Sequence, residues 1–170
     1  MKYTPPRTDK KIRAVYCALF LLAILGMVIK VGGFYTTALQ CSAVIMLTAC
    51  LAIFIKYELI TYTYILIERN NTLDFYIDKC TGKRGSYVCY FPLTDAVRLE
   101  KLDKNSKSRL REEYKGISFY KHTKNIFTGD KYVLVFQNGQ GYDAVIFEPD
   151  ERFIRLINNE MDKNKEAENQ

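Results

Sequence analysis

The sequence predicts two membrane-spanning helices that form a hairpin, followed by a domain of β-strands that ends in a helix. The chain has 170 residues, which is enough for one ordinary domain and a membrane anchor. Charge is unevenly distributed, because residues 57–170 hold 18 of the 25 basic and 18 of the 19 acidic residues. Between Ala14 and Ile55, Lys30 is the only charged residue. The apolar part therefore predicts the anchor, and the charged part, with its short runs of Thr, Tyr, Ile and Val, predicts the β-rich domain.

Two apolar segments, 12–30 and 34–55, are predicted to cross the membrane. The second has 22 residues without a charge and would extend roughly 33 Å as a helix, enough for a hydrocarbon core about 30 Å thick. The first is shorter, but it reaches the required length if its flanking arginine directs its side chain to the headgroups. So few residues separate the segments that we expect a tight turn and an antiparallel hairpin. A secretory signal peptide is the alternative for residues 1–29, but no typical cleavage site follows them.

Basic residues around the two segments predict their orientation. Four of them precede the first segment and Lys56 follows the second, and basic residues favour the cytoplasmic side of a membrane. Both termini are therefore predicted to be cytoplasmic. The predicted parts of the chain are a basic N-terminus (1–11), the membrane hairpin (12–55), a cytoplasmic domain (57–162) and a flexible tail (163–170). Residues 1–56 carry the whole net charge of +6, which argues against nucleic acid as the partner.

The cysteines and the single histidine indicate neither a metal site nor a cofactor. Three of the five cysteines lie in the apolar segments, and the other two, Cys80 and Cys89, flank a predicted turn. A disulfide between these two is not expected in a reducing cytoplasm. Their spacing is not that of a zinc site, and His122 is the only histidine. We therefore predict no bound metal and no cofactor.

The pattern of apolar residues after the second segment predicts seven strands and one helix. The predicted strands cover residues 58–68, 73–79, 87–93, 96–102, 117–122, 132–137 and 142–147. Asn138-Gly139 is the strongest hairpin signal, and Pro92 predicts an edge or a kink. Residues 103–115 are polar and are predicted to form the longest connection of the domain. A helix begins near Pro149, with Phe153, Leu156, Ile157 and Met161 at helical spacing.

Seven strands in sequential hairpins followed by an amphipathic helix is the order of the pleckstrin-homology (PH) superfold, in which the helix closes one end of a bent sheet or barrel. The segments Tyr57–Thr63, Leu73–Arg84 and Phe147–Ile157, placed after two short apolar spans, resemble bacterial two-span membrane proteins with a C-terminal PH-like domain. The resemblance covers most of the chain. It implies a seven-stranded PH-like barrel with a C-terminal helix, and it offers no catalytic residue.

A basic region within the domain predicts contact with anionic lipid headgroups. Residues 79–131 hold 13 basic and 6 acidic residues, and a basic group near a membrane surface contributes about 1 kcal/mol. PH domains that bind phosphoinositides use basic residues of their early hairpins. The candidate lipid-binding residues are Lys79, Lys83, Arg84, Lys101, Lys104, Lys107, Arg109 and Arg111. The alternative is that these side chains only keep a loop soluble.

Aromatic side chains suggest a second surface, at a sheet edge or in a groove beside the terminal helix, where a protein partner would bind. The candidates are Tyr87, Tyr90, Phe91, Phe119 and Tyr120. A small barrel has to be filled by large side chains, so we expect most of them to lie in the core.

Together these patterns predict a non-enzymatic integral membrane protein whose cytoplasmic PH-like domain binds a protein partner or orients on anionic lipid. The alternative is an accessory subunit of a membrane transport or envelope-assembly complex, in which the spans make the important contacts. An enzyme is a third class with little support, because His122 lies between Lys121 and Lys124, as on a solvated surface, with no evident nucleophile.

Overall fold

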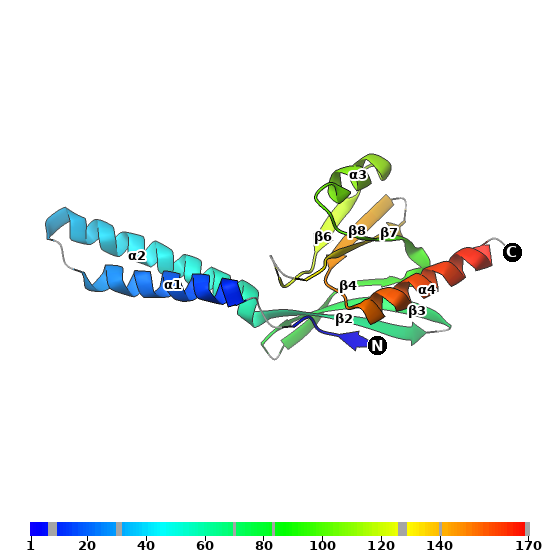
Figure 1. Cartoon of the computed structure of the whole chain (residues 1–170), viewed down its shortest axis with the longest axis horizontal. Helices are drawn as coiled ribbons and strands as arrows, with labels where there is room; N and C mark the ends of the chain where they lie inside the picture. The colour runs from blue at the N-terminus through cyan, green and yellow to red at the C-terminus, as the bar shows by residue number, and fades with distance from the viewer. Residues whose placement is uncertain are drawn as a thin grey trace. The chain divides into compact units, whose positions relative to one another are not determined.

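A computed structural model describes the chain in two compact units, residues 7–60 and residues 1–6 with 61–170 (Figure 1). The described residues are 1–6, 10–29, 32–69, 71–82, 84–125, 129–139 and 141–168, with the backbone alone for residues 34, 167 and 168.

The first unit is a hairpin of two apolar helices, α1 (Lys10–Val28) and α2 (Gly33–Phe54). Both are long and apolar enough to cross a membrane. The helices pack through small residues: Ala23 and Ala43 are buried, and a Cβ added to Gly26 would lie 3.2 Å from the Cβ of Ala43. The glycine therefore lets the two backbones approach closely, as in membrane helix pairs.

A polar contact joins the two helices at the open end of the hairpin. A π-helical turn, Ile55–Leu59, continues α2 and carries Glu58. The Glu58 carboxylate accepts hydrogen bonds from Arg13 Nε at 2.7 Å and from the Tyr16 hydroxyl at 3.1 Å. Because Arg13 and Tyr16 belong to the first turns of α1, this carboxylate ties the start of one helix to the end of the other.

The second unit begins with a four-stranded sheet of β1 (Lys2–Tyr3), β2 (Ile60–Arg69), β3 (Thr72–Thr81) and β4 (Arg84–Pro92), in that order. β1 pairs with β2, with Tyr3 opposite Tyr64 and their rings stacked 6.3 Å apart. The prediction of seven strands is therefore wrong, since the described residues form eight. The sequence did not reveal β1 because two residues are too few for an alternating pattern.

The second sheet has the order β5-β7-β8-β6, which corrects the predicted run of sequential hairpins. Its strands are β5 (Ala96–Lys101), β6 (Ser118–Lys121), β7 (Tyr132–Asn138) and β8 (Gly141–Phe147). β6 pairs in parallel with β8, so β5 and β6 occupy opposite edges of the sheet. The chain between them must cross three strand spacings, about 14 Å. It does so through a helix, α3 (Ser106–Glu113), where we predicted an irregular connection.

The main core lies between the two sheets and the C-terminal helix α4 (Glu151–Glu168). Phe75 is its centre, with ring centroids 5.0 Å from Phe91, 5.3 Å from Phe147 and 5.8 Å from Phe153. Phe153 comes from the apolar face of α4, as its helical spacing predicted. The helix continues to Glu168, into the segment for which we predict a flexible tail.

A second core covers the opposite face of the second sheet. Its buried residues are Leu110, Ile117, Val133, Val135, Ala144 and Ile146. α3 and α4 therefore lie on opposite sides of this sheet (Figure 1).

Candidate functional site

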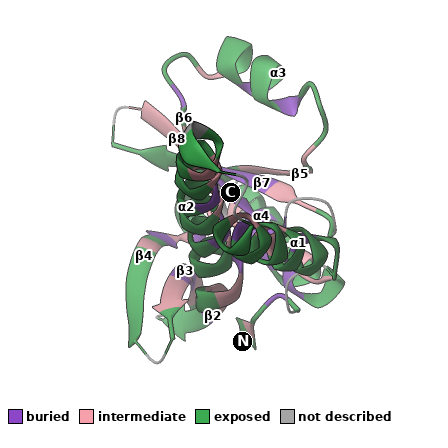
Figure 2. Ribbon diagram, turned by 90° about the vertical axis from the view of Figure 1, so that its left-hand side faces the viewer, coloured by how far each residue is buried: buried purple, intermediate pink, exposed green. Residues whose placement is uncertain are grey.

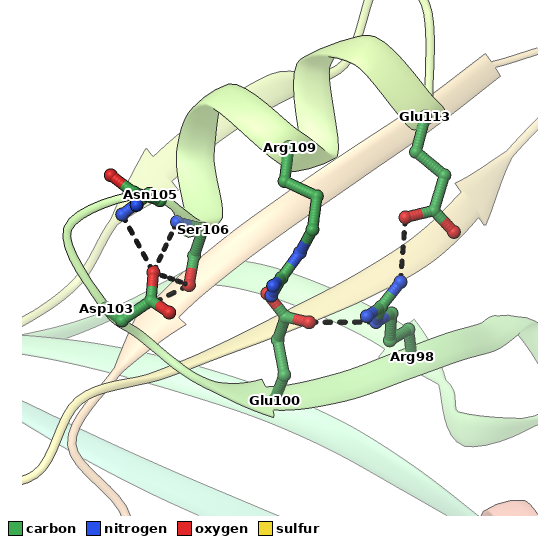
Figure 3. Close-up of polar contacts among 7 residues, drawn as sticks. All are labelled: Arg98, Glu100, Asp103, Asn105, Ser106, Arg109 and Glu113. Atoms are coloured by element: carbon green, nitrogen blue, oxygen red, sulfur yellow. Dashed lines mark hydrogen bonds and ion pairs between the residues drawn. The ribbon is translucent and has the colours of Figure 1, made fainter.

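The predicted basic region is built around α3, whose first turn is fixed by Asp103. The Asp103 carboxylate accepts hydrogen bonds from the backbone N–H groups of Asn105 and Ser106 and from the Ser106 hydroxyl (Figure 3). The serine hydroxyl and these amides hold the pKa of Asp103 below its ordinary value. Asp103 thus satisfies amides that α3 leaves free at its N-terminus.

An ion-pair network joins α3 to β5 (Figure 3). Glu100 binds two arginines, Arg98 on its own strand at 2.9 Å and Arg109 on α3 at 2.8 Å. Arg98 also contacts Glu113 at the other end of the helix, at 2.7 Å. The buried Leu110 anchors the inner side of the same helix. α3 is therefore a positioned element with one apolar and one charged side.

This arrangement divides the predicted lipid-binding residues of the second sheet into two groups. Lys101 and Arg109 form ion pairs, with Asp130 and Glu100 respectively. The other three, Lys104, Lys107 and Arg111, are exposed and form no ion pair among the described residues. We call these three residues the α3 face. Within it, Lys107 and Arg111 lie over the ring of Phe119, at 5.9 and 5.6 Å from its centroid, which holds both cations in place.

The remaining candidates belong to the β3–β4 hairpin. Arg84 is exposed at the start of β4, whereas Lys79 is half-buried and lies near His122. Burial, and then the Lys79 ammonium, lower the pKa of His122. Lys83 lies outside the described residues. The seven described candidates therefore lie on separate elements, the β3–β4 hairpin and the region of β5 and α3.

Three tyrosines form a second candidate surface on the outer side of the first sheet. The ring centroid of Tyr76 lies 4.7 Å from that of Tyr90 and 5.9 Å from that of Tyr87. Tyr87 is 72% exposed and Tyr90 52% exposed, and β4, which carries them, is an edge strand with much exposed surface (Figure 2). We call Tyr76, Tyr87 and Tyr90 the tyrosine face.

The tyrosine face corrects our expectation that most of the aromatic candidates lie in the core. Of the five, only Phe91 is buried, and Tyr120, like Tyr87 and Tyr90, is exposed. The sequence contained a signal for this exposure. Side chains alternate between the two faces of a strand, so if Phe75 and Phe91 lie in the core, their neighbours in the sequence lie on the outer face of the sheet. Tyr76 and Tyr90 occupy those positions.

Sequence reasoning did not find a buried polar cluster at the end of β8. Glu148 is 4% exposed, and its carboxylate accepts hydrogen bonds from the backbone N–H groups of Lys124 and Asn125. The Tyr64 hydroxyl accepts the N–H of Glu148 at 3.1 Å and donates to the carbonyl of His122 at 2.6 Å. Burial raises the pKa of Glu148 although these amides oppose the shift. The cluster fixes the chain that follows β6 against the end of β8.

The structure assembles no evident metal site, since no group of three or more His, Cys, Asp or Glu side chains within the described part of the chain is arranged to hold an ion.

Two facing sheets, a C-terminal helix in the core and two preceding apolar helices define the class of protein: a PH-like domain attached to a helical hairpin. The chain belongs to the bacterial PH-like domain family (DUF6106), whose model matches residues 4–165. This finding confirms the resemblance drawn from the sequence. Neither a curated protein nor a solved structure matches the chain.

The Glu100 network predicts how firmly α3 is held. Glu100→Gln removes the carboxylate shared by two arginines and is expected to destabilise α3 by about 1 kcal/mol, seen as faster hydrogen exchange of its backbone amides. Lys101→Gln, which breaks an exposed ion pair, is the matched control. It is expected to change the free energy of opening of α3, as hydrogen exchange reports it, by less than about 0.5 kcal/mol. Equal effects of the two substitutions would contradict the anchoring role of Glu100.

Glu148 predicts a dependence of stability on pH. The pKa of Glu148 is raised in the folded state, so its carboxyl loses its proton at a lower pH in the unfolded chain than in the folded one. As the pH rises, the contribution of Glu148 to the free energy of unfolding therefore falls. The stability of the wild type relative to Glu148→Gln is therefore expected to increase as the pH is lowered from about 7 to about 5, measured by chemical denaturation. The same substitution at the exposed Glu112 controls for the loss of a carboxylate. A constant difference over this pH range would show that Glu148 does not titrate as expected.

Proposed function

We propose that this chain is a non-enzymatic integral membrane protein that holds its PH-like domain against the cytoplasmic side of a bilayer, where the domain orients on anionic headgroups. The observation that carries this proposal is the absence of a linker: β2 begins at Ile60, directly after the turn Ile55–Leu59 that continues α2. A domain joined in this way stays within a few residues of the membrane surface if α2 spans the bilayer.

The strand pairing of the N-terminus supports the hairpin topology. β1 precedes α1 and pairs with β2, which follows α2. Residues on opposite sides of a membrane are unable to share a sheet, so this pairing favours two crossings that begin and end on one side. The basic residues at that end of the hairpin support the cytoplasm as the side.

Two basic elements of the domain support contact with anionic lipid. The α3 face presents two cations on an anchored helix, Lys107 and Arg111, and a third, Lys104, in the turn before it. Each is expected to contribute about 1 kcal/mol near an anionic surface. Arg84 begins the strand after the β3–β4 turn. β2, β3 and β4 are successive neighbours in the first sheet, and Arg84 lies opposite Thr81 at the end of β3.

Charge reversal on the α3 face tests the contact with lipid. The chain has no tryptophan, so Ser108→Trp on α3 provides a reporter in the full-length protein reconstituted in nanodiscs. We expect headgroup-labelled lipid in anionic discs to quench the fluorescence of this tryptophan, and the quenching to weaken as the salt concentration rises. Adding Lys107→Glu and Arg111→Glu is expected to reduce the quenching at least threefold. Arg152→Glu with Arg155→Glu, on the solvent side of α4, changes the net charge equally and is expected to leave quenching unchanged. Quenching that is equal in zwitterionic discs, or unaffected by the α3 substitutions, would refute the contact.

Protein binding is the second candidate function, and the tyrosine face favours it. Exposed tyrosines supply large contact area at low entropic cost and are enriched at protein interfaces. The edge strand β4 offers unpaired backbone groups to an added strand. A partner that binds there needs only the domain, whereas the alternative of an accessory subunit in a transport or envelope-assembly complex places the contacts on α1 and α2.

Co-purification from native membranes separates these two alternatives. We expect Tyr87→Ala with Tyr90→Ala to reduce the recovery of a partner at least fivefold, because the exposed rings supply the contact, while Tyr120→Ala on β6 serves as the exposed-tyrosine control. Replacing residues 12–55 by an unrelated hairpin is expected to keep the partner. Loss of the partner on this replacement alone would instead identify an accessory subunit.

A further inference from the structure

An apolar groove of about 640 Å³ runs along the helical hairpin. α1 contributes Tyr16, Phe20 and Leu21 to its lining, and α2 contributes Cys50, Leu51 and Phe54. The groove begins near the open end of the hairpin, where Glu58 joins the two helices, and continues for about 8 Å along α1. Its volume is within the range of sites that hold small ligands, about 300–1,000 Å³.

The packing of the two helices explains why the groove exists. Around Gly26 and Ala43 the backbones are close, because no large side chain separates them. Nearer the open end, the Tyr16 ring meets Phe54 edge-on at 5.8 Å, and Cys50 Sγ donates to the Tyr16 carbonyl at 3.2 Å. Cys50 therefore lies against the backbone of α1, and the Tyr16 and Phe54 rings stand beside this contact as part of the groove lining.

Basic residues lie at the open end of the hairpin, near one end of the groove. Cys17 of α1 also lines the groove. Lys10 lies seven residues before Cys17 and Arg13 four residues before it, so both lie on the same face of α1 as Cys17. Lys56 follows α2, with its ammonium over the ring of Tyr57 at 5.5 Å. Glu58 is the one acidic residue of the described part of this unit, and its carboxylate already binds Arg13 and Tyr16. The open end therefore carries a net positive charge.

We propose that this groove seats one acyl chain of an anionic phospholipid, whose phosphate is held by Lys10, Arg13 and Lys56. An empty apolar groove forfeits dispersion contacts, and a flexible chain fills it better than a rigid helix. The charge at one end selects a molecule with an anionic head and an apolar tail. This inference goes beyond the proposed function, since it concerns one bound lipid on the helices rather than contact of the domain with a surface.

Native mass spectrometry of the full-length protein, after exchange into detergent with added phosphatidylglycerol or phosphatidylcholine, tests the proposal. We expect one phosphatidylglycerol per chain to be retained in preference to phosphatidylcholine. Leu51→Trp fills the groove and is expected to reduce retention at least fivefold. Ile45→Trp, on the exposed opposite face of α2, adds the same ring outside the groove and is expected to leave retention unchanged.

A second variant tests the headgroup without disturbing apolar packing. Lys10→Gln with Lys56→Gln is expected to abolish the preference for phosphatidylglycerol. Retention unchanged in Leu51→Trp would overturn the proposal, and so would a preference unchanged in the lysine variant. A wild-type dimer that becomes monomeric in Leu51→Trp would identify a second copy as the occupant and also overturn it. Lys107→Glu with Arg111→Glu is expected to leave retention unchanged, which separates this site from the α3 face.

Discussion

The arrangement of the domain depends on the burial of both faces of β7 and β8. Their central residues form continuous apolar runs, Val133–Phe136 and Ala144–Phe147, in which every side chain is buried. Such strands require cover on two sides. The first sheet and α4 supply one cover, and α3 supplies the other. Without α3, the Val133 and Val135 side of the sheet would face water.

This requirement links the fold to the placement of charge. The helix that covers the outer face also carries basic residues, so their positions follow from packing against Leu110 on one side and from the Glu100 network on the other. Glu100 and Glu113 bind Arg98 and Arg109, and among the described residues no acidic side chain forms an ion pair with the α3 face. A basic surface that would be mobile in an irregular loop is therefore held in one geometry.

The sequence was sufficient to predict the elements with strong periodicity. The two apolar helices, the hairpin at Asn138-Gly139 and the apolar face of α4 follow from local pattern alone, and the structure contains all three. β1 and the β5–β7 pairing depend on contacts distant in sequence. The sequence pattern did not predict α3, because Leu110 is its only strongly apolar residue. Two signals did indicate a helix there: Asp103 and Ser106 are typical of a helix start, and the apolar runs of β7 and β8 require cover on both faces. For the basic region, composition predicted an excess of charge, but which cations are neutralised depends on tertiary ion pairs.

The pairing of β1 with β2 has a consequence for biosynthesis. Lys2 and Tyr3 leave the ribosome before either helix, yet their partners Ile65 and Tyr64 emerge only after both helices have been made. The first sheet therefore stays incomplete until both helices and β2 have been synthesised. If the helices insert as proposed, folding of the domain depends on correct insertion, because a hairpin with a different number of crossings would separate β1 from β2.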